Sequence, residues 1–231
     1  MKNVFITGTN RGLGLELVKQ YLAQGRKVIA TCRNRSKASE LEKLSRNYTN
    51  KLIVVELDLM SNKSISQLSK TLSNTPIDLY INNAGIMGSK DRELGQINGD
   101  TWTEVFRVNT IAPVLVVQEL LKNIYDGVEK KMIFVSSRVG SIEQNTGGGL
   151  YSYRSSKTAL NQVVKSLSVD LTADRVTAIA LHPGWVLTDM GGHNALIDVK
   201  TSVSGMISVI ESSTFSDTGK FFNYDGSNIN W

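Results

Sequence analysis

The sequence has few of the features that mark secreted or membrane-spanning proteins. A single cysteine, Cys32, excludes an internal disulfide framework and suits a reducing compartment. The longest purely apolar stretch, residues 111–117, is far too short to span a bilayer, and no charged and then apolar leader precedes Gly8. These absences predict a cytoplasmic protein that has no membrane partner.

Concentrated charge is also absent. The formal net charge of +5 could indicate binding to nucleic acid, but the Lys and Arg residues are spread along the chain, with no block of about five or six like charges. They are not clustered with aromatic residues either, so we expect no nucleic-acid partner. With 41% hydrophobic residues and no repeat or low-complexity linker, the chain is predicted to form one domain, 1–231, with one sizeable core.

Short apolar runs alternate with helical patterns along the whole chain. The runs occupy residues 2–7, 27–31, 52–57, 78–82, 132–136, 176–181 and 219–223. The helical patterns occupy residues 15–22, 37–46, 62–73, 102–125, 152–171 and 197–211. Nearly continuous apolar runs are typical of a parallel sheet that is covered on both faces. The alternation predicts an α/β fold, a single-domain, Rossmann-type, doubly wound parallel β-sheet with helices on both faces and ligands at the carboxyl ends of the strands.

A glycine-rich turn joins the first apolar run to the first helical pattern. Its spacing is Gly8-x-x-x-Gly12-x-Gly14, one residue longer than the common Gly-x-Gly-x-x-Gly pattern. Glycines in this position let the backbone approach a pyrophosphate, which then lies at the positive end of the helix. The order of strand, turn and helix therefore favours a dinucleotide site over a tight loop that binds nothing.

Tyr153 and Lys157 lie four residues apart in a helical pattern. Four residues are about one turn, so the phenol and the ammonium share a face, with roughly 5–6 Å between their Cβ atoms. A free tyrosine has a pKa of about 10 and is a poor acid or base at neutral pH. A nearby ammonium favours the phenolate and is expected to draw that pKa down. The alternative is a chance spacing of two unrelated side chains.

Together these residues resemble the short-chain dehydrogenase/reductase family over essentially the whole chain. The matching segments, in order, are Thr7-Gly8-x-x-x-Gly12-x-Gly14, Leu57-Asp58, Asn82-Asn83-Ala84-Gly85, Asn109, Ser136-Ser137, Tyr153-x-x-x-Lys157 and the segment 183–188. Within the family, residues 182–192 and 221–226 are similar to the branch of sniffer-type carbonyl reductases and C-factor-like proteins.

The resemblance implies a catalytic role for Ser137, Tyr153, Lys157 and Asn109. Tyr153 exchanges a proton with the substrate oxygen, and Lys157 lowers its pKa and holds the nicotinamide ribose. Ser137 hydrogen-bonds the carbonyl oxygen, and Asn109 anchors a water that extends the proton path. Strand alternation points neighbouring residues in opposite directions, and the family's serine usually closes this strand. We therefore favour Ser137, with Ser136 as the alternative.

Further residues are implied to bind the cofactor, which by the same resemblance is NADP(H) rather than NAD(H). They are Gly8, Asn10, Arg11, Gly12, Leu13, Gly14, Arg33, Asp58, Leu59, Asn83, Ala84, Gly85, Tyr153, Lys157, Pro183, Gly184, Val186 and Thr188. Asp58 matches the family's contact to the adenine amino group, and it could equally cap a helix that begins near Ser61.

Charge independently favours NADP(H). Enzymes of this fold that bind NAD usually place a carboxylate after the second strand, for the ribose hydroxyls. Here that strand is followed by Arg33 and Arg35, with no acid before Glu40, and Arg11 lies in the glycine turn. Guanidiniums bind a 2′-phosphate through charge-assisted, often bidentate hydrogen bonds. The alternative is that these arginines are ordinary surface residues.

The sequence therefore predicts an NADP-dependent oxidoreductase of the carbonyl reductase type, acting on a small-molecule carbonyl or alcohol and needing no metal. The alternative is a non-catalytic or signalling nucleotide-binding protein on the same fold, which could lose Tyr153 or Lys157. The helical patterns 102–125 and 152–171 carry apolar residues on more than one face. In the family such helices commonly pair across a two-fold axis, so we expect a homodimer or homotetramer, unless loops bury the second face.

Overall fold

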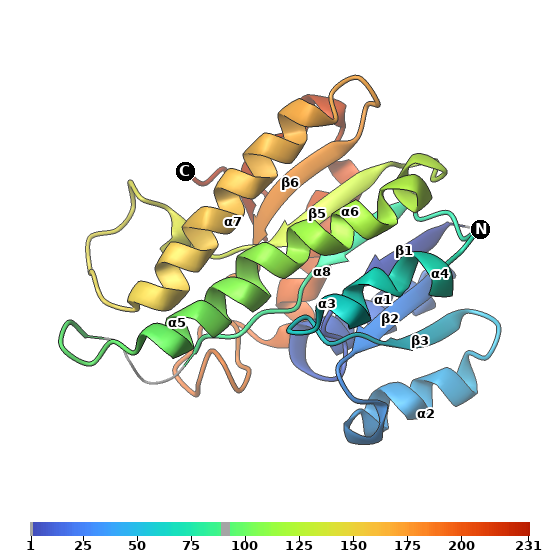
Figure 1. Ribbon diagram of the computed structural model, residues 1–231, viewed down its shortest axis with the longest axis horizontal. Helices are drawn as coiled ribbons and strands as arrows, with labels where there is room; N and C mark the ends of the chain where they lie inside the picture. Colours follow the sequence, from blue (N-terminus) through green and yellow to red (C-terminus); the bar gives the residue numbers. More distant parts are fainter. Residues whose placement is uncertain (1, 89–92) are drawn as a thin grey trace.

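A computed structural model describes residues 2–88 and 93–231. The described residues form a seven-stranded parallel sheet of order β3-β2-β1-β4-β5-β6-β7, with helices on both faces (Figure 1). The predicted doubly wound fold is thereby confirmed. The strands are β1 (Asn3–Ile6), β2 (Lys27–Cys32), β3 (Leu52–Glu56), β4 (Leu79–Asn82), β5 (Lys131–Val135), β6 (Thr177–His182) and β7 (Phe221–Asn223).

The helices begin and end close to the predicted patterns. The α-helices are α1 (Gly12–Ala23), α2 (Ser39–Asn47), α3 (Asn62–Ser66), α4 (Leu68–Thr71), α5 (Gly99–Phe106), α6 (Ala112–Tyr125), α7 (Tyr151–Asp170) and α8 (Val199–Ser212). The described residues also form short helical turns, η1 (Arg35–Lys37), η2 (Arg107–Ile111), η3 (Arg138–Gly140) and η4 (Phe215–Asp217). No helix in the described part of the chain is long and apolar enough to cross a membrane.

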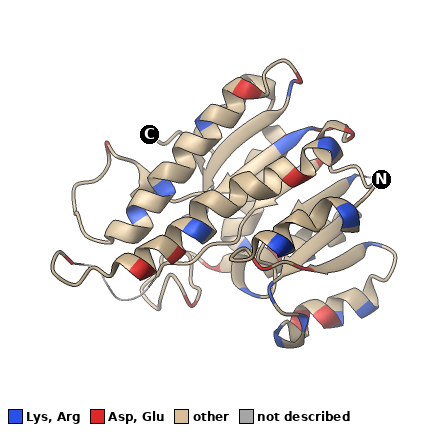
Figure 2. Ribbon diagram, in the orientation of Figure 1, with Lys and Arg blue, Asp and Glu red and all other residues tan. Residues whose placement is uncertain are grey.

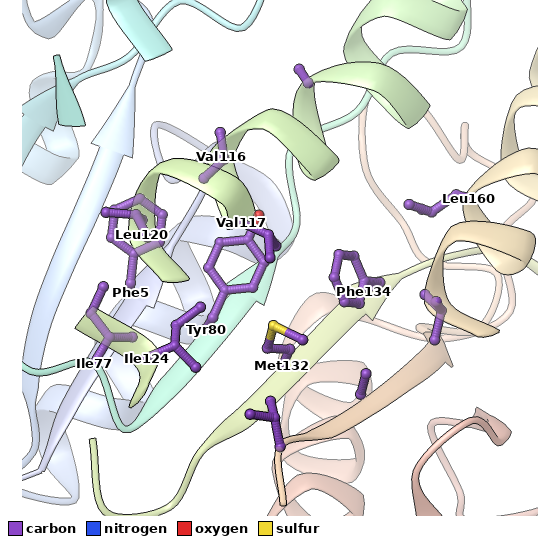
Figure 3. Close-up of a cluster of buried hydrophobic side chains, with 14 of the residues drawn as sticks. Phe5, Ile77, Tyr80, Val116, Val117, Leu120, Ile124, Met132, Phe134 and Leu160 are labelled. Atoms are coloured by element: carbon purple, nitrogen blue, oxygen red, sulfur yellow. The ribbon is translucent and has the colours of Figure 1, made fainter. Parts of the chain in front are cut away.

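Alternate residues of each strand enter two separate apolar layers. In β1, Phe5 belongs to the cluster beneath α6 and α7, whereas Val4 and Ile6 belong to the cluster beneath α1 and α8. Figure 3 shows the first cluster, with the rings of Phe5 and Tyr80 beside α6 and the ring of Phe134 farther toward α7. Phe5 and Tyr80 are stacked, with 5.7 Å between ring centroids. Both faces of the sheet are therefore buried, as the continuous apolar runs predict.

The apolar periodicity of the segment 102–125 predicts one regular helix, but the structure differs. It comprises α5, a π-helical turn at Arg107–Ile111, and α6. Pro113 supplies a physical reason, because it has no N–H to donate to the carbonyl of Asn109 four residues earlier. Single π-turns of this kind are frequent at functional sites, and this one contains the predicted catalytic residue Asn109.

Charged residues of both signs are distributed over the outer helices and the ends of the strands (Figure 2). The most buried ion pairs lie near the start of the sheet, away from the predicted site. Arg26 donates to Glu129 at 3.0 Å and to Glu211 at 2.6 Å, and Lys2 also pairs with Glu129. Burial raises the pKa of Glu129, but hydrogen bonds from Arg26 and Lys2 outweigh burial, so that the pKa lies below its ordinary value.

Replacing Glu129 with glutamine is therefore expected to lower the free energy of unfolding by about 2 kcal/mol at pH 7, since Arg26 loses a largely buried partner. A carboxyl with a depressed folded pKa stabilises the fold above its unfolded pKa, about 4.3, and this contribution is lost as the pH falls through the lower folded value. Urea denaturation at pH 7 and at pH 3 checks both points. Glu40→Gln, in an exposed pair with Lys43, should have no measurable effect, and an equal loss in both variants would contradict the account.

Candidate active site

The glycine turn after β1 is built against the end of β4. Asn83 Nδ2 donates to the carbonyl oxygens of Thr7 and Gly8 at 2.9 and 3.0 Å, and Thr7 Oγ1 accepts from the amides of Asn83 and Ala84 at 3.1 and 3.0 Å. A Cβ on Gly8 would lie 2.8 Å from Ala84 Cα, and one on Gly14 would lie 2.2 Å from the carbonyl oxygen of Gly8. Positions 8 and 14 therefore have no room for a side chain, and the glycine turn packs against the segment that follows β4.

The first turn of α1 suits a diphosphate. Its N-cap residue, Arg11, is extended, and no side chain caps the helix. The first amides of an α-helix have no intrahelical acceptor, so they remain available to an anion at this positive end. Gly12 adopts a left-handed φ of 55°, so the backbone approaches the helix end without a side chain in the way. The residues present therefore fit the pyrophosphate of a dinucleotide.

The structure distinguishes the three predicted phosphate-binding arginines. Arg35 donates to both carboxylate oxygens of Glu42, at 2.6 and 3.1 Å, so its guanidinium is already neutralised. Arg11 Nη1 donates to Asp189 Oδ2 at 2.7 Å in an exposed pair that a stronger anion could displace. Arg33, exposed directly after β2, has no hydrogen bond or ion pair to any described residue. Arg33 is therefore the guanidinium most available to a ligand.

Asp58 does not cap the helix that follows it. Ser61 occupies the N-cap position of α3 and accepts from the amide of Ser64 at 3.2 Å. Asp58 instead accepts from the amide of Met60 through Oδ1, and the neighbouring Leu59 is buried. The capping alternative is therefore wrong for Asp58.

No described His, Cys, Asp or Glu residues gather in a group of three or more that could hold a metal ion.

Tyr153 and Lys157 lie in α7, on its face toward the sheet. Lys157 is buried, and its Nζ lies 5.8 Å from the centroid of the Tyr153 ring and donates to the carbonyl of Val135 at 2.8 Å. A Cβ built on Gly85 would lie 3.3 Å from Asn109 Oδ1 and 3.5 Å from Lys157 Nζ. The absent side chain of Gly85 thus leaves the space in which the amide and the ammonium approach each other.

Asn109 is fixed by three hydrogen bonds. Its Oδ1 accepts from the amide of Ile86 at 2.8 Å, and its Nδ2 donates to the carbonyl of Ile86 at 2.8 Å and to Ser156 Oγ at 3.0 Å. The side chain is fully buried. It therefore joins the segment after β4 to α7, and Ser156, one residue before Lys157, is a partner that the sequence did not reveal.

The protonation of the site differs from the expectation drawn from spacing. Burial raises the pKa of Tyr153 to about 12, although the neighbouring Ser137 hydroxyl acts to lower it. Burial also lowers the pKa of Lys157 to about 8. The expectation that the pKa of Tyr153 is drawn below its ordinary value is therefore wrong for the chain alone, because burial outweighs the influences that favour the phenolate. At neutral pH the phenol is protonated and can act as a proton donor.

The two serines that close β5 have different surroundings. Ser136 is buried, and its hydroxyl donates to Asn161 Oδ1 in α7 at 2.6 Å. Ser137 is half-buried and borders the Tyr153 phenol, whose pKa it affects. Only Ser137 is thus placed where a carbonyl oxygen near Tyr153 could receive its hydrogen bond.

The loop after β6 carries the last predicted group, Pro183, Gly184, Val186 and Thr188. Gly184 has a left-handed φ of 85°, and a Cβ there would lie 2.6 Å from Ile197. Thr188 reaches the glycine turn, since its Cγ2 would lie 3.7 Å from a Cβ on Gly12. Met190 was not predicted, yet its Sδ lies 4.0 Å from the Tyr153 hydroxyl. This loop therefore bridges the glycine turn and the catalytic residues.

Comparison with known proteins gives consistent results. The family model for short chain dehydrogenase matches residues 2–196. The carbonyl reductase Sniffer of D. melanogaster is 36% identical, with a TM-score of 0.94 and 100% of both chains covered. The NADPH-bound carbonyl reductase from chicken fatty liver is 33% identical, with a TM-score of 0.92, covering 100% of this chain and 99% of that chain. C-signal of Myxococcus xanthus is 40% identical over 156 residues, which is 68% of this chain and 93% of that protein. These similarities confirm the resemblance that the sequence motifs predict.

Proposed function

The chain belongs to the short-chain dehydrogenase family, and from this premise we propose that it is an NADP(H)-dependent carbonyl reductase in which Tyr153 is the acid and base. The observation that carries the proposal is the arrangement of Tyr153, Lys157 and Ser137 beside a glycine turn that fits a dinucleotide. The substrate is a small-molecule carbonyl, or the corresponding alcohol in the opposite direction.

The proposed chemistry divides between the cofactor and the chain. A bound nicotinamide would supply or accept the hydride at this site. In the reductive direction the Tyr153 phenol gives its proton to the carbonyl oxygen, and Ser137 donates a hydrogen bond that stabilises the developing charge. The phenol is protonated at neutral pH and is therefore available as this donor.

Lys157 and Asn109 act on the phenolate that remains. The ammonium stabilises the new negative charge electrostatically, at a distance of 5.8 Å from the ring centroid. Asn109 holds its neighbouring backbone and Ser156 in place, and it faces Lys157 across Gly85. We propose that the path by which the site regains its proton runs past these two residues.

Residues at the ends of five strands, together with two residues of α7, are proposed to hold the cofactor. The glycine turn residues Gly8, Asn10, Gly12, Leu13 and Gly14 bind the pyrophosphate with the end of α1. Arg33 and Arg11 bind the 2′-phosphate, and Arg11 leaves Asp189 to do so. Asp58 and Leu59 contact the adenine, and the residues that contact the nicotinamide ribose and ring are Asn83, Ala84, Gly85, Tyr153, Lys157, Pro183, Gly184, Val186 and Thr188. The similarity to the chicken carbonyl reductase, which is NADPH-bound, supports this assignment.

Turnover of a panel of aldehydes and ketones, measured with NADPH and with NADH, tests the proposal. We expect NADPH consumption with several carbonyls and a higher kcat/KM for NADPH than for NADH. A purified, folded protein that binds NADPH and reduces none of the panel would favour the other candidate.

That other candidate is a nucleotide-binding signalling protein. The 40% identity with C-signal supports it. Such a protein needs the glycine turn but has no need of a proton donor, whereas this chain keeps Tyr153, Lys157 and Ser137 together. We therefore place carbonyl reduction first.

Assembly as a homodimer is the next prediction. On α6 and α7, the side chains of Val117, Leu160 and Val164 are buried in the core. Val114 and Val163 are only half-buried, and both helices lie on the outside of the molecule in Figure 1. An isologous contact would cover this α6–α7 face. Light scattering at micromolar concentration is expected to give at least twice the monomer mass, and Val163→Glu is expected to lower it. A monomeric mass for the unaltered chain would refute the prediction.

A further inference from the structure

The loop of residues 138–150, which leads from the serines to α7, is anchored to that helix at two points. Near its start, the carbonyl of Gly140 accepts from Thr158 Oγ1 at 2.8 Å. Near its end, Arg154 Nε donates to the carbonyl of Gly148 at 2.9 Å. Between these anchors the loop has no helix or strand, so other contacts must determine where its middle lies.

The middle of the loop is held by Trp231. The carbonyl oxygen of Trp231 accepts three hydrogen bonds, from Ser141 Oγ at 3.0 Å, from the amide of Ile142 at 3.0 Å and from the amide of Glu143 at 3.4 Å. Asn230 Nδ2 adds a bond to Glu143 Oε1 at 3.1 Å. Three consecutive loop residues therefore depend on one acceptor about ninety positions away in the chain.

Trp231 is in turn positioned by β7. The chain folds back after β7, so that the amide of Ile229 donates to the carbonyl of Phe221 at 2.8 Å and Asn228 pairs with Phe222 in an antiparallel bridge. The Trp231 ring stacks on the buried Phe221 ring, with 5.5 Å between centroids and 21° between planes. A stacked aromatic pair of this kind stabilises the contact beyond the burial of its area.

The stacked ring lies at the surface, since Trp231 is 38% exposed. It borders a surface cavity of about 440 Å³ that is also lined by Glu143, Lys220 and Phe221. Truncation of Trp231 therefore removes the stacking contact at the edge of the core. The consequences should therefore be concentrated in the loop that Trp231 holds.

We infer that Trp231 is a positioning residue for the carbonyl substrate, acting through the loop of residues 138–150. Ile142, at the centre of the Trp231 contacts, is 73% exposed and follows Ser137 by five residues. The loop joins Ser137 to the start of α7, which carries Tyr153, so the inference places Ile142 in the wall of the carbonyl site, at a position that depends on its hydrogen bond to Trp231. The inference rests on the proposed function, because a wall matters to KM only if a carbonyl binds at Tyr153.

Two measurements on Trp231→Ala test the inference. The first is amide hydrogen exchange at Ile142 and Glu143, which we expect to accelerate at least tenfold while exchange within α7 stays unchanged. The second is steady-state reduction of para-nitrobenzaldehyde with NADPH. A loop of residues 138–150 that is no longer held in place orients the aldehyde poorly. We therefore expect the KM for the aldehyde to rise about tenfold, with a smaller change in kcat. The dissociation constant of NADPH, titrated by fluorescence, should stay within about twofold.

Matched variants separate positioning from general destabilisation. Trp231→Phe keeps an aromatic ring over Phe221 and should restore both the exchange rates and KM. Lys220→Ala, on the rim of the same cavity and paired with Asp217 rather than with the loop, should change neither. Ser141→Ala removes one of the three donors and should shift both quantities in the direction of Trp231→Ala, which keeps the test available if that variant fails to fold.

Two results would overturn the inference. One is unchanged exchange at Ile142 and Glu143 in folded Trp231→Ala. The other is accelerated exchange with an unchanged KM, which would show that the loop does not bear on the substrate. If the unaltered protein reduces no carbonyl, the proposed function fails, and the exchange measurement still decides whether Trp231 holds the loop.

Discussion

Replacing Tyr153 with phenylalanine is expected to lower kcat by about 10³-fold while leaving the affinity for NADPH nearly unchanged, because the ring remains and only the proton donor is lost. The phenol borders Ser137, and Lys157 lies on the same side of α7, so no other described hydroxyl has the same surroundings. Reduction of an aldehyde, together with fluorescence titration of NADPH, measures the two quantities separately.

Tyr151 provides the matched control for this substitution. It lies at the first position of α7, two residues before Tyr153, and its side chain is 37% exposed. Six residues separate it from Lys157, which places it well off the face that the ammonium occupies. Tyr151→Phe should therefore retain most of the activity. Equal losses of kcat in the two variants would refute the assignment of Tyr153 as acid and base.

Replacing Arg33 with aspartate is expected to weaken NADPH binding at least tenfold, about 1.4 kcal/mol, and to narrow or reverse the preference over NADH. Arg33 follows β2, where a ribose-binding carboxylate stands in NAD-dependent relatives of the fold. Its guanidinium makes no hydrogen bond or ion pair with any other described residue, in contrast to Arg35, which is paired with Glu42. The new carboxylate would repel a 2′-phosphate and accept hydrogen bonds from a free ribose.

The control for Arg33 must carry the same change of charge without the contact. Lys37→Asp meets this need, because Lys37 is exposed in the neighbouring turn η1 and has no ion pair with a described residue. Its effect on NADPH should be small and further reduced by salt. If Arg33→Asp leaves the ratio of the NADPH and NADH dissociation constants unchanged, Arg33 is ordinary surface and the cofactor argument from charge is wrong.

The strands and their order in the chain could be predicted because each is a short, nearly continuous apolar run in a sheet buried on both faces. Interruptions within the helical patterns were harder to predict. The π-turn at Asn109 interrupts an apolar pattern that continues from α5 into α6, and the single signal for it was the missing N–H of Pro113. Likewise, the split between α3 and α4 has no marker such as proline or glycine in the segment 62–71.

The candidate site could be predicted as a set of residues but not as a set of contacts. The predicted site residues lie at the carboxyl ends of strands or on the helix that follows, and a parallel sheet brings such positions to one edge. They include the glycine turn, Asn83, Ser137, Tyr153 and Lys157. Contacts between distant segments left no local pattern. Arg11 and Asp189 are 178 positions apart, and Met190 approaches Tyr153 only because the loop after β6 folds back.

The pKa of Tyr153 likewise could not be predicted from the sequence. Spacing along a helix places an ammonium near the phenol, but it does not show how far each group is removed from water. Burial proves to be the largest influence on both groups, raising the pKa of Tyr153 and lowering that of Lys157. Desolvation depends on the packed structure, so it could not have been obtained from the four-residue spacing.

Transfer of deuterium from NADPH in which both hydrogens at the nicotinamide C4 are replaced by deuterium tests most directly the claim that this chain is a carbonyl reductase. The unaltered protein is incubated with para-nitrobenzaldehyde and the labelled cofactor, and the alcohol is analysed by mass spectrometry. We expect one deuterium on the carbinol carbon of each product molecule, and labelled alcohol formed about 10³-fold more slowly with Tyr153→Phe. Tight NADPH binding with no labelled alcohol from the unaltered protein would contradict it.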